Sequence, residues 1–204
     1  MNPVDNASAL AVRGISKRFG RTEVLSDVSF AVAPGQSLAI VGANGCGKST
    51  LLKICAGLVS PTAGEVRVTG RLGYCPQHAD LAPHLTAQDH MTWLGSGLGL
   101  AAVAARDRGK QIASALHMKD SRRQIRRLSG GTAQKVNLVC AMMSRPDVLL
   151  LDEPYQGFDE GAYLDFWDLV ESWCRQGIAV VVVTHMLREL HRVDLVLDLG
   201  GRVD

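Results

Sequence analysis

The chain has 204 residues, of which 47% are hydrophobic and 21% charged, and its formal net charge is +2. This is the ordinary composition of a soluble globular protein with one domain and its own core. Such a small net charge gives no reason to expect nucleic acid as a partner.

Targeting and membrane signals are missing from the sequence. The N-terminus has no basic and apolar signal segment, and the longest weakly polar runs, residues 94–105 and 178–183, are far shorter than the ~20 residues of a membrane-spanning helix. The cysteines are widely spaced and form no C-x-x-C pair, which indicates reduced thiols. We therefore expect a cytoplasmic protein that reaches a membrane only through a partner.

The first third of the chain predicts short, antiparallel strands at residues 11–15, 24–32 and 65–74, separated by turn signals. Between them, the apolar run 38–41 leads into a glycine-rich loop that fits G-x-x-x-x-G-K-[ST]. Such a loop wraps phosphates with backbone N–H groups, while its lysine reaches the β- and γ-phosphates and its serine binds Mg²⁺. The predicted ATP-binding residues are Gly42, Asn44, Gly45, Cys46, Gly47, Lys48, Ser49 and Thr50.

Cys46 has two interpretations. A thiol beside Lys48 and a helix N-terminus is a candidate for oxidative inhibition, because both neighbours favour the thiolate. The simpler interpretation is that the loop needs only a small side chain there.

The middle of the chain, residues 83–144, predicts helix without a long strand. Gly95, Gly97 and Gly99 each cost a helix about 1 kcal/mol relative to alanine, so the helix there is expected to be short or broken. The basic run 122–127 is either a solvated face or a patch for an anionic partner. Leu128, Ser129, Gly130 and Gly131 precede a predicted helix over 132–144, as an ordinary helix cap or as a phosphate-binding element.

The last third alternates apolar strands with a helix. Residues 148–151, 179–183 and 195–199, like 38–41, lack polar alternation, which predicts strands buried on both faces of a mainly parallel sheet. An amphipathic helix is predicted over 159–174. The fold class is therefore α/β.

Polar residues follow several of these strands, where ligands of open α/β sheets bind. Asp152 could hold the Mg²⁺ of the nucleotide, Glu153 could polarise a water, and His185 could contact the γ-phosphate. Each alone is commonly a solvated or capping residue, but their convergence beside the phosphate loop favours catalysis.

Together, the glycine-rich loop, Leu128–Gly131, residues 148–154 and His185 resemble the nucleotide-binding subunit of ABC transporters over almost the whole chain. The resemblance implies one domain, residues 1–204. It would have a P-loop NTPase (RecA-like) core, an N-terminal antiparallel β subdomain, and a helical subdomain inserted at about residues 83–144. Many members continue beyond the point where this chain ends, so no C-terminal regulatory domain is expected.

The resemblance also implies residue roles. Phe19 would stack on adenine, Gln77 would sense Mg²⁺ and the membrane partner, and Asp159 would end a loop at a dimer interface. Leu128, Ser129, Gly130 and Gly131 would cover ATP bound to a second subunit, with Glu153 as general base.

The implied partners are an integral membrane permease and a second ATPase subunit, identical or different. Thr132 and the loop 155–159 depart from the commoner family pattern and resemble exporter-type members, so export is expected. The helical middle is the expected docking surface for the permease, with the glycine-rich segment 94–100 adapting to it. The cargo is not readable from the sequence.

Two other functions compete with this interpretation. A small P-loop kinase would need an acceptor site and a lid, and it has no use for Leu128–Gly131. A soluble ABC ATPase of DNA repair or translation usually has tandem cassettes or a coiled-coil insertion, which this sequence lacks.

Overall fold

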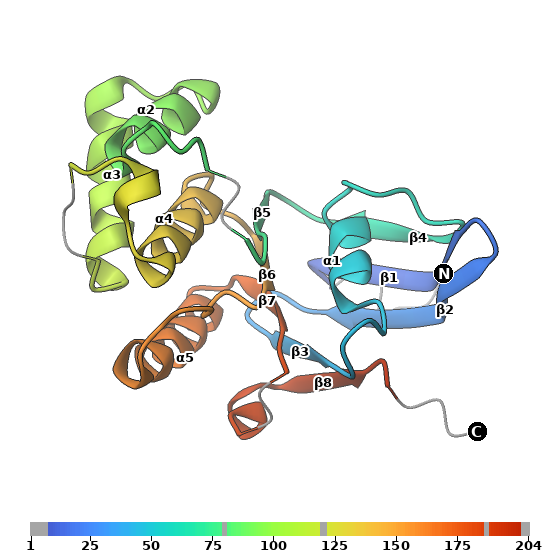
Figure 1. Cartoon of the computed structure of the whole chain (residues 1–204). Coiled ribbons are helices and arrows are strands. Elements are labelled where there is room, and N and C mark those ends of the chain that lie inside the picture. The colour runs from blue at the N-terminus through green and yellow to red at the C-terminus, as the bar shows by residue number, and fades with distance from the viewer. Residues whose placement is uncertain (1–7, 79–80, 119–121, 186–187, 201–204) are drawn as a thin grey trace.

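A parallel sheet in the order β5-β6-β7-β3-β8 forms the centre of the computed structural model, which describes residues 8–78, 81–118, 122–185 and 188–200 (Figure 1). Each strand pairs in parallel with its neighbours. The strands are β3 (Ser37–Val41), β5 (Leu72–Cys75), β6 (Val148–Asp152), β7 (Ala179–Val183) and β8 (Leu195–Asp198).

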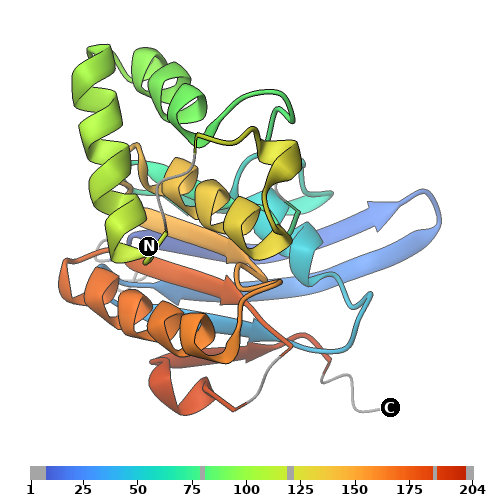
Figure 2. The same cartoon turned by 60° about the vertical axis from the view of Figure 1, so that its left-hand side comes forward.

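The three central strands are buried at every position, as their unbroken apolar sequence predicted. Side chains alternate between the two faces. Leu150 and Val181 belong to a core shared with helix α1 (Lys48–Cys55), whereas Leu149 and Val182 belong to a core shared with α4 (Gly130–Met142) and α5 (Glu160–Arg175). Figure 2 shows α5 lying across one face of the sheet. Both faces are covered, so no polar alternation is needed.

Strand β8 differs from this prediction. Residues 195–199 were expected to be buried on both faces, but Leu195 is 36% and Val196 49% exposed. The reason is position, because β8 is an edge strand that pairs only with β3. The prediction of a two-sided buried strand was wrong here.

A separate antiparallel sheet in the order β2-β1-β4 packs beside α1 (Figure 1). Its strands are β1 (Leu10–Phe19), β2 (Thr22–Val32) and β4 (Ala63–Val68). Antiparallel pairing was expected, but the expectation of short strands was wrong, since β1 has 10 residues and β2 has 11. Irregularities in their register, with Gly14 at φ 58° and Asp27 at φ 50°, let the long hairpin continue past local breaks.

The segment 65–74, predicted as one antiparallel strand, belongs to two sheets. Gly70 at φ 92° turns the chain between β4 and β5. Beyond that turn, Leu72–Cys75 pairs in parallel with β6. The positive φ of Gly70 takes the backbone out of the extended conformation, and the chain leaves the antiparallel sheet there.

Helices α2 (Ala87–Gly97), α3 (Ala102–Ala115) and α4 lie together on one side of the parallel sheet (Figure 1). Helix without strand was predicted for this stretch. The glycine-rich segment does end a helix: α2 stops at Gly97, and Gly99 has φ 72°. Gly95 has a packing role, because a Cβ there would overlap the Cβ of Ala105 on α3.

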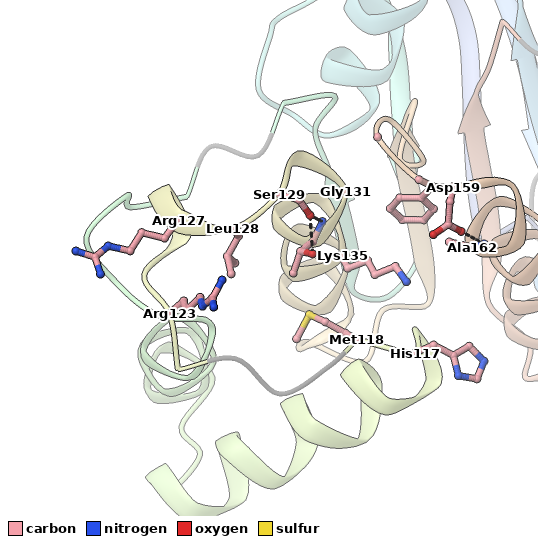
Figure 3. A pocket seen from close by; sticks show the side chains of 13 residues that line it. His117, Met118, Arg123, Arg127, Leu128, Ser129, Gly131, Lys135, Asp159 and Ala162 are labelled. Carbon is pink, nitrogen blue, oxygen red and sulfur yellow. Dashed lines mark hydrogen bonds between the residues drawn. The ribbon is translucent and has the colours of Figure 1, made fainter.

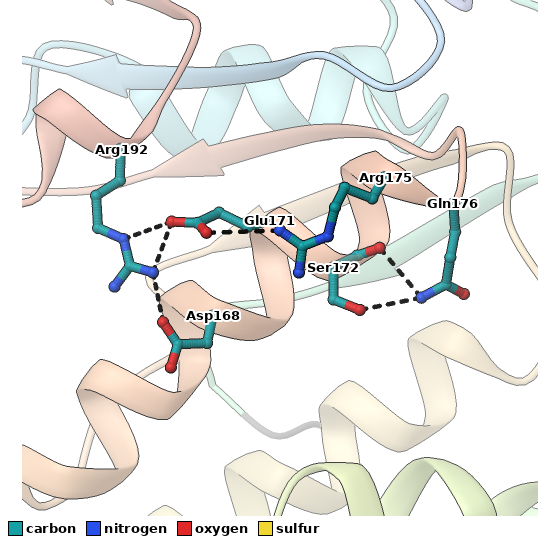
Figure 4. Close-up of polar contacts among 6 residues, drawn as sticks. All are labelled: Asp168, Glu171, Ser172, Arg175, Gln176 and Arg192. Carbon is teal, nitrogen blue, oxygen red and sulfur yellow. Dashed lines mark hydrogen bonds and ion pairs between the residues drawn. The ribbon is translucent and has the colours of Figure 1, made fainter.

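An ion-pair network fixes the segment before β8 to α5 (Figure 4). The guanidinium of Arg192, in the short helix η3 (Leu190–Arg192), donates to Glu171 Oε1 at 2.7 Å and to Asp168 Oδ1 at 2.5 Å. Both carboxylates project from α5. The network therefore positions the chain on its way from β7 to the sheet edge.

Candidate functional site

The predicted convergence of strand ends is present in the structure. Strands β6, β7 and β3 are consecutive neighbours, so their carboxyl ends place Asp152, Thr184 and the glycine-rich loop side by side. Two contacts confirm this closeness: Ser49 Oγ donates to Asp152 Oδ1 at 3.1 Å, and Glu153 N–H donates to Val183 O at 3.1 Å.

The loop 42–49 has the backbone of a phosphate cradle. Gly42, Gly45 and Gly47 have φ of 142°, 83° and 103°, which only glycine adopts without strain. Gly47 precedes α1, so the unpaired N–H groups of the helix start point to the loop. The Lys48 ammonium is buried and donates to the carbonyls of Gly42 at 2.7 Å and Ala43 at 2.9 Å. These bonds place a cation inside the cradle.

The oxygen donors beside this cradle fit Mg²⁺. Ser49, Asp152 and Gln77 supply a hydroxyl, a carboxylate and an amide oxygen, which are hard ligands of the kind Mg²⁺ prefers. Burial raises the pKa of Asp152, and the Ser49 hydrogen bond opposes that shift. Across the described residues no cluster of three or more His, Cys, Asp or Glu could hold a metal.

Glu153 has a strained backbone and a closely held side chain. Its φ is 45°, a left-handed value that costs a non-glycine residue about 1–3 kcal/mol and is found at functional sites. The residue is 8% exposed. Its Oε2 accepts from Gln77 Nε2 at 3.1 Å and from Gln156 Nε2 at 2.8 Å, and its Oε1 lies 3.4 Å from His185 Nδ1. The structure thus brings Gln77, Glu153 and His185 together.

Several residues that hold this site were missed from the sequence. Gln134 and Asn137 of α4 each donate to Pro76 O at 3.1 Å, which fixes the backbone just before Gln77. Tyr155 shares a hydrogen bond between its hydroxyl and that of Thr184, next to His185. The unusual loop 155–159 was the one signal that could have pointed to Tyr155 and Gln156.

The segment Leu128–Gly131 leads into the start of α4. Ser129 caps the helix, because its Oγ accepts from Thr132 N–H at 3.3 Å and lies 2.8 Å from Thr132 Oγ1. Ser129 and Gly130 are exposed, and a Cβ at Gly130 would meet nothing within 4 Å. Gly131 is buried, and a Cβ there would overlap the carbonyl oxygen of Gly157.

A cavity of about 600 Å³ opens beside this segment (Figure 3). Figure 3 shows Ser129 and Lys135 on one side and Asp159, which caps α5 by accepting from Ala162 N–H at 2.8 Å, on the other. Arg123 and Arg127 of the basic run also line it. The cavity is therefore rich in cationic and N–H groups.

Phe19 lies where β1 turns into β2, with 52% of its surface exposed. The Lys17 ammonium lies 4.7 Å from the centre of its ring. An exposed phenyl face suits stacking on a flat base, and the stacking role stays a prediction.

Within the glycine-rich loop the Cys46 thiol lies against Gly42, because a Cβ at Gly42 would lie 2.8 Å from Cys46 Sγ. Burial raises the pKa of Cys55 and of Cys140 to about 12 and that of Cys174 to about 11, and it also raises the pKa of Cys75. These four thiols are therefore poor nucleophiles at neutral pH. Both interpretations of Cys46 stay open.

In the parts of the chain that the structure describes, no helix combines the length and apolarity needed to cross a bilayer.

Comparison with known proteins assigns the family. A family model described as ABC transporter matches residues 25–156. The zinc import ATP-binding protein ZnuC of Yersinia enterocolitica serotype O:8 / biotype 1B is 38% identical over 203 residues, which cover 97% of this chain and 78% of that protein. The Nod factor export ATP-binding protein I of Burkholderia lata is 31% identical over 194 residues, covering 89% of this chain and 64% of that protein.

The fold comparison agrees. The dimeric structure of MJ0796, a bacterial ABC transporter cassette, superposes with a TM-score of 0.85 at 24% identity and covers 94% of this chain and 95% of that one. At this identity the likeness shows the fold alone. With the family match and the relatives above, we conclude that the chain belongs to the ABC transporter family, as an ATP-binding ATPase subunit.

Proposed function

We propose that this subunit hydrolyses ATP at a site shared by two subunits and so drives a separate membrane permease. The observation that carries the proposal is the pair of half-sites. Glu153 is held at the strand ends beside the phosphate cradle, while Ser129 and Gly130 lie exposed at the start of α4. The family places ATP between such surfaces of two subunits arranged head to tail.

In this mechanism Lys48 would leave the loop carbonyls and donate to the β- and γ-phosphates, while Phe19 would stack on adenine. Ser49, Asp152 and Gln77 would hold Mg²⁺, which neutralises charge on the transferring phosphoryl group when bound. Gln77 donates to Glu153 through its nitrogen, so its carbonyl oxygen is left for the metal or its water.

Glu153 would act as general base by accepting a proton from the attacking water. His185 is well placed to contact the γ-phosphate, because its side chain is 52% exposed and lies beside Glu153. The second subunit would contribute Leu128, Ser129, Gly130 and Gly131, whose helix N-terminus favours an anion. Asp159, which caps α5, lies across the cavity from that segment and would be near the interface.

The permease is proposed to dock on the helical side. An apolar groove of about 570 Å³ runs between α2, the end of α4 and β5, and Leu72, Tyr74, Trp93, Leu98, Cys140 and Met143 line it. Trp93 is 71% exposed, which is unusual for so large an apolar side chain. Docking there would hold the protein at the inner face of the cell membrane, in the cytoplasm.

The proposed direction of transport differs from the one expected from the sequence. Export was expected from Thr132 and the loop 155–159, and the relatives of higher identity do not support it. The relatives at 38% identity are named for zinc import, and those at 31% for Nod factor export. We therefore propose uptake, with a transition-metal ion as cargo, and rank export second.

The first experiment measures ATP hydrolysis by the full chain over a range of protein concentrations. We expect activity per subunit to rise with concentration, because each site needs two subunits, and Glu153→Gln to abolish hydrolysis while trapping an ATP-bound dimer. Hydrolysis that is independent of concentration would argue against a shared site, and an active Glu153→Gln variant would show that Glu153 is not the base.

A second experiment tests the transport role. A tagged chain should co-purify with an integral membrane protein, and vesicles holding both should take up zinc when ATP is supplied on the side of this subunit. Release of zinc from loaded vesicles would indicate export instead. Recovery with DNA-repair or translation components and no membrane protein would favour the soluble alternative.

A further inference from the structure

Gln156 touches the proposed base more closely than any residue predicted from the motifs. Its Nε2 donates to Glu153 Oε2 at 2.8 Å, whereas Gln77 Nε2 donates to the same oxygen at 3.1 Å. A carboxylate oxygen with two amide donors has most of its hydrogen-bonding capacity filled. Oε1, which lies 3.4 Å from His185 Nδ1, keeps more of its hydrogen-bonding capacity and is the oxygen of Glu153 better placed to accept a proton from water.

The backbone that carries Gln156 is fixed on both sides. Tyr155 is 5% exposed, and its ring packs edge-on against Tyr163 at 5.1 Å and Phe166 at 5.8 Å between centroids. Its hydroxyl bonds that of Thr184. On the other side, Phe158 N–H donates to Tyr155 O at 3.0 Å. Contacts of Tyr155 with the buried core thus fix the backbone that carries Gln156.

The same loop contacts the segment that would cover the partner's ATP. Gly157 packs directly on Gly131, with no room for a side chain between them. Gln156 is the member of this loop whose side chain reaches the base.

We propose that Gln156 is a positioning residue for Glu153, and this inference rests on the proposed role of Glu153 as general base. With Gln77 it holds Oε2, so that Oε1 faces the attacking water.

The test compares Gln156→Met with Gln156→Glu in the full chain. Methionine keeps the length of the side chain and removes the donor, so kcat for Mg-ATP hydrolysis should fall about tenfold while KM for ATP stays within about twofold. Glutamate places a like charge beside Glu153, so kcat should fall further, by about 100-fold. A residue with only a structural role would tolerate methionine at unchanged kcat.

Gln111→Met is the matched control, because Gln111 is an exposed glutamine on α3, and it should hydrolyse ATP like the wild type. ATP binding and thermal unfolding of each variant show that the fold is kept. An unchanged or higher kcat for Gln156→Met would overturn the inference. If Glu153→Gln is inactive in that case, the proposed function stands and only this inference fails.

Discussion

The two half-sites of this subunit are built in opposite ways. The proposed catalytic half is held by contacts within the chain: Lys48 and Glu153 are buried, and the side chains of Gln77 and Gln156 donate to Glu153. The half formed by Ser129 and Gly130 is exposed. The difference teaches that this chain holds the proposed base and the glycine-rich loop in place by its own contacts, but leaves Ser129 and Gly130 exposed, as the proposed contact with a second subunit requires.

The largest expected effect comes from breaking one half in each of two variants. Lys48→Ala removes the cradle cation and Ser129→Arg fills the exposed half, so each alone should lose more than about 100-fold in hydrolysis. When the two variants are mixed in equal amounts, about half of the dimers contain one subunit of each, and each mixed dimer has one intact site. About a quarter of the wild-type rate should therefore return. ATPase assays of the mixture measure this. A mixture as inactive as its components would contradict two independent composite sites.

The next effect distinguishes a packed glycine from an exposed glycine at the start of α4. Gly131→Ala should lower the free energy of unfolding by about 1–3 kcal/mol, because its Cβ would overlap Gly157 O. Gly130→Ala meets nothing within 4 Å and should change it by less than about 0.5 kcal/mol. Urea unfolding of both variants tests this, and equal stabilities would show that the loop after Glu153 does not pack on α4.

A smaller effect concerns α2 and α3, which pack beside α4. Gly95→Ala should cost about 1–2 kcal/mol because α2 and α3 touch there, whereas Gly97→Ala has free space and should be neutral or stabilising by up to about 1 kcal/mol. Thermal unfolding distinguishes them. Gly97→Ala is therefore the clean test of whether this segment adapts to the permease, and unimpaired transport by it would end that hypothesis.

The smallest effect is the pH dependence of the α2 cap. Backbone and side-chain hydrogen bonds from Thr86 lower the pKa of Asp89, so its carboxylate stabilises the fold above the unfolded pKa of about 3.9 and loses that contribution as the pH falls through the folded pKa. Since Asp89 is exposed, the effect should stay below about 1 kcal/mol. The gap in melting temperature between the wild type and Asp89→Ala should be present at pH 6 and shrink toward pH 3. A constant gap would contradict it.

Local sequence was enough to predict much of the fold. Unbroken apolar runs predicted the buried strands β3, β6 and β7, because a strand covered on both faces needs no polar alternation. The spacing of the glycine-rich loop predicted a phosphate cradle, and the order of polar residues after each strand predicted their meeting at one sheet edge. These features depend on neighbours in the chain or on one topological rule.

Contacts between distant segments decided the rest. The exposure of Leu195 and Val196 follows from the edge position of β8, and the division of residues 65–74 follows from the pairing of Leu72–Cys75 with β6. The local sequence of these two segments does not identify the strand with which each one pairs. The same holds for Gln156, an ordinary loop residue by composition. It reaches Glu153 only because the buried Tyr155 and the left-handed backbone of Glu153 turn the chain back on itself.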